Sequence, residues 1–230
     1  MKAAKPKLGE GIYTAADASR ILDIPYPKAK YWFSYYARQK LSKSVNYIYH
    51  FEIKNIIAVN FLTLLEMNIF FKLREKGFKT KDIIAVHKRM ATQFETPYPF
   101  AHETLYIERN IKINTAKRKK KYLYFGDTNL FLHLDKGLQT TFPEIVMPLC
   151  EKISFDNAQL ASRYYPLGQH RSVVVDPQHQ FGQPTIEGTN ILTETLVSYY
   201  RGGESIDFIA SIYRIDPKNI IDAIDFAKAA

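Results

Sequence analysis

This 230-residue sequence contains a single cysteine, Cys150, and lacks any apolar run near the roughly 18 residues that a bilayer span requires. One cysteine cannot form an internal disulfide, which suits a reducing cytoplasm. The first residues are polar and rich in lysine, without the apolar segment of a signal peptide. We therefore expect a cytoplasmic protein without a membrane segment.

Residues arranged for catalysis or metal binding are also missing. The six histidines are scattered, without the spacing that a metal site requires. No nucleophile with supporting residues and no glycine loop suited to phosphate is present. We expect no enzyme activity, no cofactor and no metal, and we expect Cys150 to be a small core residue.

Acidic residues are scarce in the first half of the chain. Residues 1–125 hold 24 Lys/Arg and 10 Asp/Glu, whereas residues 126–230 hold 8 and 13. This basic excess suits binding to a phosphate backbone, because each neutralised phosphate releases counterions. Alternatively, the lysines only keep a domain soluble. The acidic second half suits a protein partner better than DNA.

The N-terminal region predicts two short helices joined by a tight turn. Thr14 is a suitable N-cap for the first helix, and Pro25 would end it. Pro27 suits the first turn of a second helix that runs to about Gln39. On that helix, the side chains expected in a DNA major groove are Lys28, Lys30, Tyr31, Ser34 and Arg38. Alternatively, this is an ordinary amphipathic helix with a solvated basic face.

The rest of the first half predicts a strand followed by helices. Residues 45–55 alternate like a short strand or wing. A long apolar helix is expected over 55–75, ended by Gly77, and another helix is expected after a Thr80 cap. Two strand-like segments follow, with a basic turn between them. The turn is either a solvated hairpin tip or a phosphate contact, and the expected phosphate-contacting residues are Lys43, Lys117, Arg118, Lys119, Lys120 and Lys121.

The apolar helix expected over 55–75 also suggests a homodimer. It has more large apolar side chains than the one-sided core of a small domain easily hides, namely Phe61, Leu64, Leu65, Phe70 and Phe71. A twofold dimer would match the paired half-sites of a palindromic DNA site. The alternative is that all five residues belong to an internal core.

Residues 8–125 carry a resemblance to a known domain. The two helices with their tight turn, the wing, FLTLLEMNIFFKLREKGF and PYPFA are similar to the MerR-like winged helix-turn-helix domain that opens some VapB-type antitoxins. The resemblance implies that this half binds double-stranded DNA.

The second half predicts a connector and a small helical unit. Residues 126–175 contain apolar and alternating runs that should form short strands and a helix. The runs LTETLVSYYRGG, ESIDFIASIYRI and DPKNIIDAIDFAKAA predict three helices within residues 176–230. We therefore expect a mainly α fold with small β elements. It would comprise a winged helix-turn-helix, a short α/β connector and a three-helix helix-turn-helix unit.

The segment DPQHQFGQPTIEGTNI, residues 176–191, leads into these helices. With GES at 203–205, it resembles an antitoxin domain long known only as a domain of unknown function, but it has Asn190 where that family often carries arginine. The resemblance implies a type II antitoxin that neutralises a PIN-like endoribonuclease and represses its own operon. The rival interpretation is a stand-alone transcriptional regulator without a toxin.

We expect this segment to be ordered and packed on the terminal helices, with Phe181 and Ile186 buried. Gly182 and Gly188 should hold backbone angles that a side chain would resist. An acidic surface could occupy or flank the basic groove of an RNA-binding nuclease. The candidate toxin-binding residues are Phe181, Glu187, Asn190, Glu194, Glu204 and Asp207. Alternatively, the segment only braces a second DNA-binding unit.

Overall fold

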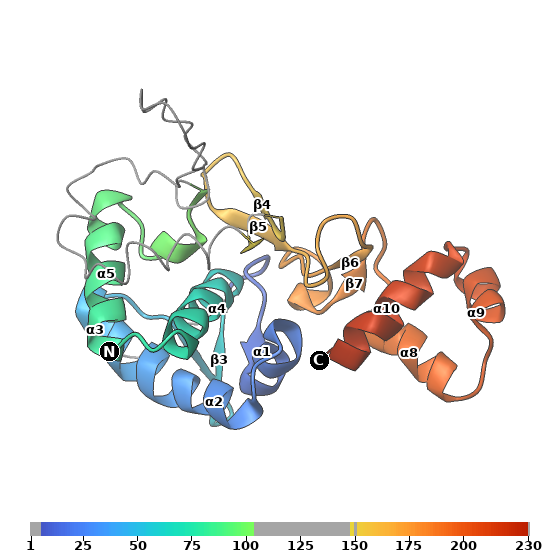
Figure 1. Ribbon diagram of the computed structural model, residues 1–230, viewed down its shortest axis with the longest axis horizontal. Coiled ribbons are helices and arrows are strands. Elements are labelled where there is room, and N and C mark those ends of the chain that lie inside the picture. Colours follow the sequence, from blue (N-terminus) through green and yellow to red (C-terminus); the bar gives the residue numbers. More distant parts are fainter. Residues whose placement is uncertain (1–5, 104–147, 150, 230) are drawn as a thin grey trace, which may run out of the picture.

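The computed structural model describes residues 6–103, 148–149 and 151–229 (Figure 1). The basic turn Lys117–Lys121, the strands expected on either side of it and Cys150 lie outside these residues. Helices α1 to α5 form one end of the molecule and α8 to α10 the other, with two small hairpins between them (Figure 1). The chain is mainly helical with small sheets, as the sequence predicted.

A three-stranded antiparallel sheet lies within the N-terminal part. It consists of β1 (Tyr13–Thr14), β2 (Phe51–Ile53) and β3 (Ile56–Val59), in the order β1-β3-β2. Tyr13 pairs with Val59, and Phe51 pairs with Ala58. The helix expected over 55–75 was therefore wrong at its start, because the β-branched residues at 56–59 pair with two strands instead.

Helix α4 (Phe61–Glu75) begins where a capping side chain permits it. The side chain of Asn60 accepts a hydrogen bond from Thr63 N at 2.9 Å. Gly77 follows the helix with φ of 90°, and this confirms the predicted stop. Helix α5 (Thr80–Gln93) has Lys79 as its N-cap residue, so the predicted cap at Thr80 was wrong; the Thr80 hydroxyl lies 3.1 Å from Tyr36 Oη.

Helix α1 (Ala15–Leu22) confirms the first predicted helix and its cap. Asp17 N donates to Thr14 Oγ1 at 3.3 Å, and Thr14 N donates to Asp17 Oδ2 at 2.9 Å, which is a capping box. Asp23 ends the helix in the left-handed conformation, with φ of 51°. Helix α2 (Tyr26–Tyr31) then starts directly after Pro25.

The second helix is longer than predicted. From α2 the chain continues as a π-helix over Trp32–Leu41 and as α3 (Ser42–Val45), ending at Asn46 in the left-handed conformation. Ala29, Trp32 and Phe33 are buried and form its inner side. No glycine or proline interrupts residues 28–45, and this explains why the helix does not stop near Gln39.

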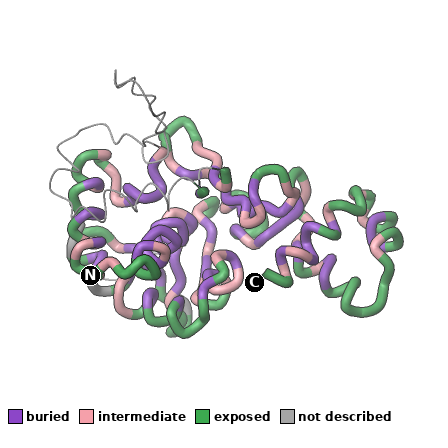
Figure 2. Tube along the Cα trace, viewed as in Figure 1, coloured by how far each residue is buried: buried purple, intermediate pink, exposed green. Residues whose placement is uncertain are grey.

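Helix α4 is the centre of the N-terminal core and is buried along most of its length (Figure 2). The five apolar residues that suggested a dimer all have an exposure of 9% or less: Phe61, Leu64, Leu65, Phe70 and Phe71. The ring of Phe70 packs on that of Trp32, with centroids 6.1 Å apart. The argument for a dimer from surplus apolar surface was therefore wrong, because the chain itself covers these residues.

Three short strands form in the expected connector, and one more forms in the 176–191 segment. Strand β4 (Ile153–Phe155) pairs with β5 (Ala161–Tyr164), and β6 (Val173–Val174) pairs with β7 (Thr185–Ile186). Tyr164 also bridges to Val175, so the two hairpins adjoin.

The three terminal helices form where predicted, as α8 (Thr193–Arg201), α9 (Ile206–Tyr213) and α10 (Pro217–Ala229). Ser205 caps α9 by accepting a hydrogen bond from Phe208 N. Ile220, Ile224 and Phe226 are buried, whereas Ile221 is 44% exposed. Of the helices in the described part of the chain, none is long and apolar enough to cross a membrane.

Candidate functional site

The 176–191 segment lies against the N-terminal part as well as against the terminal helices. Ile12 N donates to the carbonyl oxygen of Phe181 at 3.1 Å. Gly182 sits on the buried ring of Tyr13, where a Cβ would lie 2.0 Å from Tyr13 Oη. With φ of 85°, Gly182 combines a left-handed backbone with a close approach that no side chain permits.

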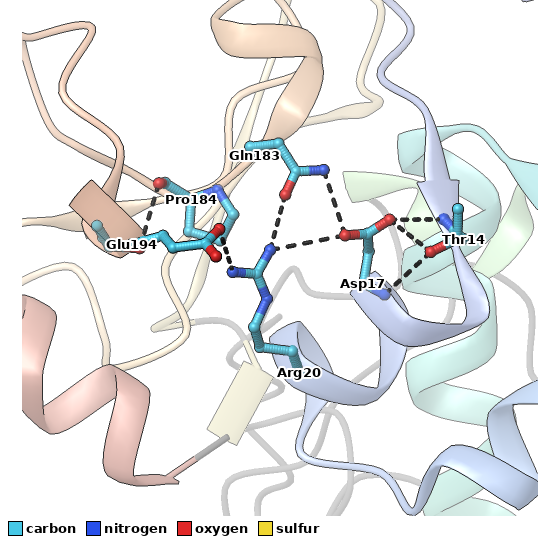
Figure 3. Close-up of polar contacts among 7 residues, drawn as sticks. Thr14, Asp17, Arg20, Gln183, Pro184 and Glu194 are labelled. Atoms are coloured by element: carbon cyan, nitrogen blue, oxygen red, sulfur yellow. Dashed lines mark hydrogen bonds and ion pairs between the residues drawn. The ribbon is translucent and has the colours of Figure 1, made fainter. Parts of the chain in front are cut away.

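A polar cluster joins α1 to this segment and to the first turn of α8 (Figure 3). Arg20 Nη2 donates to Gln183 Oε1 at 2.7 Å and lies 3.6 Å from Asp17 Oδ1. Arg20 Nη1 lies 3.6 Å from Glu194 Oε2. Asp17 belongs to the capping box of α1, so the cluster is tied to the start of that helix.

The terminal helices contact this segment and the residues just before it. Thr193 N of α8 donates to the carbonyl oxygen of Pro184 at 3.0 Å, and Ser172 N, which precedes the segment, donates to Asp222 Oδ2 of α10 at 2.7 Å. Burial of Ile186 at 1% exposure is confirmed. The predicted order and packing are therefore observed, and the contact with α1 is an addition to them.

Phe181 was expected to be buried, and this was wrong. Its side chain is 66% exposed. The residue itself has φ of 55°, and its carbonyl oxygen is occupied by Ile12 N, an arrangement that leaves the ring outside the fold. Gly188, with φ of 74°, confirms the other backbone expectation in this segment.

A polar pocket of about 420 Å³ opens beside the segment. Arg163 Nε donates to Asp176 Oδ2 at 2.9 Å, and His179 Nδ1 lies 3.2 Å from the same oxygen. Glu187 Oε1 accepts a hydrogen bond from Tyr165 Oη at 2.7 Å. Asp176 is buried and its Oδ1 accepts Gln178 N, so this carboxylate organises the turn at the start of the segment.

Arg163 and Gln183 are site residues that sequence reasoning missed. Hydrogen bonding to Tyr165 and Asp176 raises the pKa of the half-exposed Arg163, whose positive charge is paired with Asp176 at 2.9 Å beside the pocket. Within residues 6–103, 148–149 and 151–229, no group of three or more His, Cys, Asp or Glu side chains could hold a metal.

The candidate DNA-contacting residues of the second helix are all exposed: Lys28, Lys30, Tyr31, Ser34, Arg38 and Lys43. The ring of Tyr31 stacks on that of Tyr35, with centroids 5.4 Å apart. Arg38 Nη2 lies 2.8 Å from Glu52 Oε1 on β2, so a carboxylate already partners this guanidinium. The structure thus brings the candidates together on one helix, with Arg38 tied to the hairpin β2–β3.

The candidate toxin-binding residues are not gathered in one patch. Phe181, Glu187 and Asn190 are exposed on the 176–191 segment, and Glu194 is paired with Arg20. The remaining two, Glu204 and Asp207, are exposed around the start of α9. Figure 1 places α9 at the far end of the molecule, away from β7.

Parts of the sequence are similar to known proteins. Residues 173–227, from β6 into α10, match a family described as "Protein of unknown function (DUF433)". The chain is 32% identical over 88 residues to "Putative antitoxin VapB45" of Mycobacterium tuberculosis strain H37Rv. That match covers 38% of this chain and spans only 37% of the length of that relative.

A solved structure resembles nearly the whole chain. The X-ray crystal structure of Rv2018 from Mycobacterium tuberculosis superposes with a TM-score of 0.66 at 20% sequence identity. The likeness covers 98% of this chain and 100% of that chain. At this identity, the likeness establishes a shared fold.

Proposed function

We propose that this protein is the cytoplasmic antitoxin of a type II toxin–antitoxin pair, and that it binds its own operator DNA as a repressor. The observation that carries the proposal is the partial match to a protein named as an antitoxin, within a chain that presents a basic helix face at its other end. The family match over 173–227 supports the antitoxin half. The charge distribution supports the DNA half.

The DNA-binding surface is the outer face of α2 and the π-helix that continues it. The inner residues of this helix are buried in the core, and this fixes the position of the outer face. A tight turn separates the helix from α1. A major groove admits one helix, and basic and hydroxyl side chains on that helix reach phosphates and base edges. Lys28, Lys30, Tyr31 and Ser34 take this role. Arg38 positions the β2–β3 wing through Glu52 and contacts DNA beside it.

Phosphate contacts would come from Lys43 and from the basic turn, Lys117 to Lys121. The segment Lys117 to Lys121 contributes five basic charges, and Lys43 contributes one more. Each phosphate contact contributes about 0.9 to the slope of log affinity against log salt concentration.

Operator binding is tested with duplex DNA from upstream of the gene, measured by fluorescence anisotropy at several salt concentrations. The variant Lys28→Ala/Arg38→Ala should lose affinity at least about tenfold and lower the salt slope by one to two. The matched control is Arg201→Ala/Lys228→Ala, which removes the same charge from exposed positions on α8 and α10. Equal binding by the two variants would rule out the helix face.

The toxin partner is a PIN-like endoribonuclease that docks on the 176–191 segment. The exposed ring of Phe181 offers a hydrophobic anchor. Glu187 and Asn190 add exposed polar groups on the same segment, and Glu194 adds one in the first turn of α8. Carboxylates here complement the basic groove that an RNA-cutting enzyme needs. Glu204 and Asp207 lie around the start of α9, away from this segment, and are not part of this docking surface.

Toxin neutralisation is tested by co-expressing the full chain with the nuclease encoded beside it and measuring residual RNA cleavage. Phe181→Ala should weaken the complex and release nuclease activity, whereas Leu8→Ala, another highly exposed apolar residue, should not. Operator binding with no affinity for the neighbouring gene product would instead favour the stand-alone regulator. A homodimer completes the proposal, because twofold symmetry matches paired half-sites.

A further inference from the structure

Helix α9 is apolar on both of its sides, although only one side is covered. Its sequence is IDFIASIY, and its inner residues Ile209 and Ala210 are buried against α8 and α10. On the opposite side, Phe208 is 48% exposed and Ile212 is 49% exposed. A surface helix normally turns polar side chains to solvent, and a helix that is apolar all round is normally buried.

The exposed apolar side of α9 is formed by two side chains one helical turn apart. Phe208 and Ile212 are separated by four residues and therefore lie on one face of the helix. Tyr213 lies on a different side of α9 and packs edge-on against the partly exposed Tyr199 of α8, with ring centroids 5.9 Å apart. Contiguous exposed apolar surface on a soluble protein marks an interaction site.

The charges along α9 are segregated by sign. Glu204 and Asp207 lie at its N-terminal end, whereas Arg214 is its C-cap residue, and all three are exposed. Beyond α9, Asp216 and Lys218 carry opposite charges at the start of α10. Glu204, Asp207 and Arg214 have no ion-pair partner among the residues that the structure describes. A face that is acidic at one end and basic at the other complements itself when it is turned end for end.

We infer that α9 is a dimerisation helix, which pairs antiparallel with α9 of a second copy about a twofold axis. Phe208 then packs on the partner's Ile212, and Asp207 faces the partner's Arg214. A twofold contact makes each such pair twice, and the antiparallel helix dipoles add to the attraction. This inference deepens the homodimer of the proposed function by naming its surface. It is measured on the free protein, so it can hold or fail independently of operator and toxin binding.

The proposed α9–α9 interface is small, so its affinity should be low. Stable specific interfaces bury about 1,200–2,000 Å² in total, and an eight-residue helix with two flanking tyrosines supplies less than that. We therefore expect a dissociation constant on the order of 10 µM. Because α9 and the basic face of α2 lie at opposite ends of the chain (Figure 1), the dimer would suit half-sites separated by more than one helical turn.

Charge reversal tests the self-complementarity directly. In sedimentation velocity over 1–200 µM (roughly bracketing the expected dissociation constant), the wild-type chain should pass from monomer to dimer. Asp207→Arg and Arg214→Asp should each remain monomeric, because each places like charges opposite one another twice. Mixed in equal amounts, these two variants should form a heterodimer, and the double variant Asp207→Arg/Arg214→Asp should dimerise again.

The apolar contact is tested with Phe208→Asp, which should abolish the dimer, against Ile56→Asp as control. Ile56, on β3, is also an exposed large apolar residue, at 55% against 48% for Phe208, and it is far from α9 in sequence. Circular dichroism and thermal melting of every variant show whether it folds. A folded wild-type chain that stays monomeric throughout, or single-reversal variants whose mixture stays monomeric, would overturn the inference and leave α9 to a different protein.

Discussion

Gly182 provides the sharpest test of how the two ends of this chain are joined. Replacing it with alanine places a Cβ 2.0 Å from Tyr13 Oη and 2.6 Å from Tyr13 Cζ. Tyr13 is fully buried and forms part of β1, so it cannot move aside cheaply. Overpacking of this kind costs about 1–3 kcal/mol. A left-handed backbone angle adds about 1 kcal/mol for any residue other than glycine.

Gly188→Ala is the matched control, because its φ is 74° and no atom lies within 4 Å of the added Cβ. It should cost only the backbone strain, about 1 kcal/mol. Urea unfolding followed by circular dichroism should therefore place Gly182→Ala about 1–3 kcal/mol below Gly188→Ala in stability. Tyr13→Phe, which removes the nearest atom, should recover part of that difference. Equal stabilities of the two alanine variants would refute the close approach of Tyr13.

Two further predictions concern polar groups. Arg20→Ala removes the contacts to Gln183 and Glu194, which are partly exposed, so it should cost no more than about 1 kcal/mol yet speed amide exchange at the start of α8. Burial raises the pKa of the Glu66 carboxyl above its ordinary value of 4.5, against the opposing effect of His87, so folding takes up a proton. Stability from this group is present below pH 4.5 and is lost as the pH rises through the raised pKa. Urea unfolding of Glu66→Gln across pH 4–8 (about the window of that titration) should lack this decline; an unchanged pH profile would contradict it.

Helices whose ends are set by nearby capping residues, glycines or prolines could be predicted from the sequence. Helix α1 has its capping box and Pro25, and α8 to α10 are separated by glycines, Ser205 and Pro217. Each of these signals acts within one helical turn, so no distant contact can override it easily.

The start of α4 was mispredicted because its cause is not local. The run IIAVNFLTLLEM is continuously apolar around Asn60, and such a run fits a helix or a buried strand equally well. Strand β3 forms because β1 and β2 pair with it on either side. Strand β1 lies much earlier in the sequence, so this pairing is not a local signal. Asn60 was a readable capping signal that could have divided the run.

The basic helix face could be predicted from the sequence, whereas the contacts of the 176–191 segment with Ile12, Tyr13 and Arg20 could not. Alternation of buried aromatic and exposed polar residues on the second helix shows its two sides. The pairing of Arg20 with Gln183, 163 residues away, leaves no periodic trace. Phe181 misled because large aromatic residues are usually buried, and only the backbone angle at that residue turns its ring outward.

These contacts imply that the two ends of the chain unfold together. The joint between the N-terminal part and the 176–191 segment has three components. They are the backbone hydrogen bond from Ile12 to Phe181, the Arg20 cluster, and the packing of Gly182 on the buried Tyr13. Typical values for such contacts sum to about 3–5 kcal/mol, a large fraction of the stability of either part. A unit of three short helices is marginal alone, so it should gain most from this contact.

Calorimetry should therefore record a single transition, with calorimetric and van't Hoff enthalpies in agreement. Gly182→Ala should split it into two transitions, the lower one belonging to the terminal helices, whereas Gly188→Ala should keep one. Two transitions in the wild-type chain would mean that the joint is weaker than its geometry implies. In that case the basic face and the 176–191 segment would belong to bodies that move independently, and a partner on one could not influence the other through this contact.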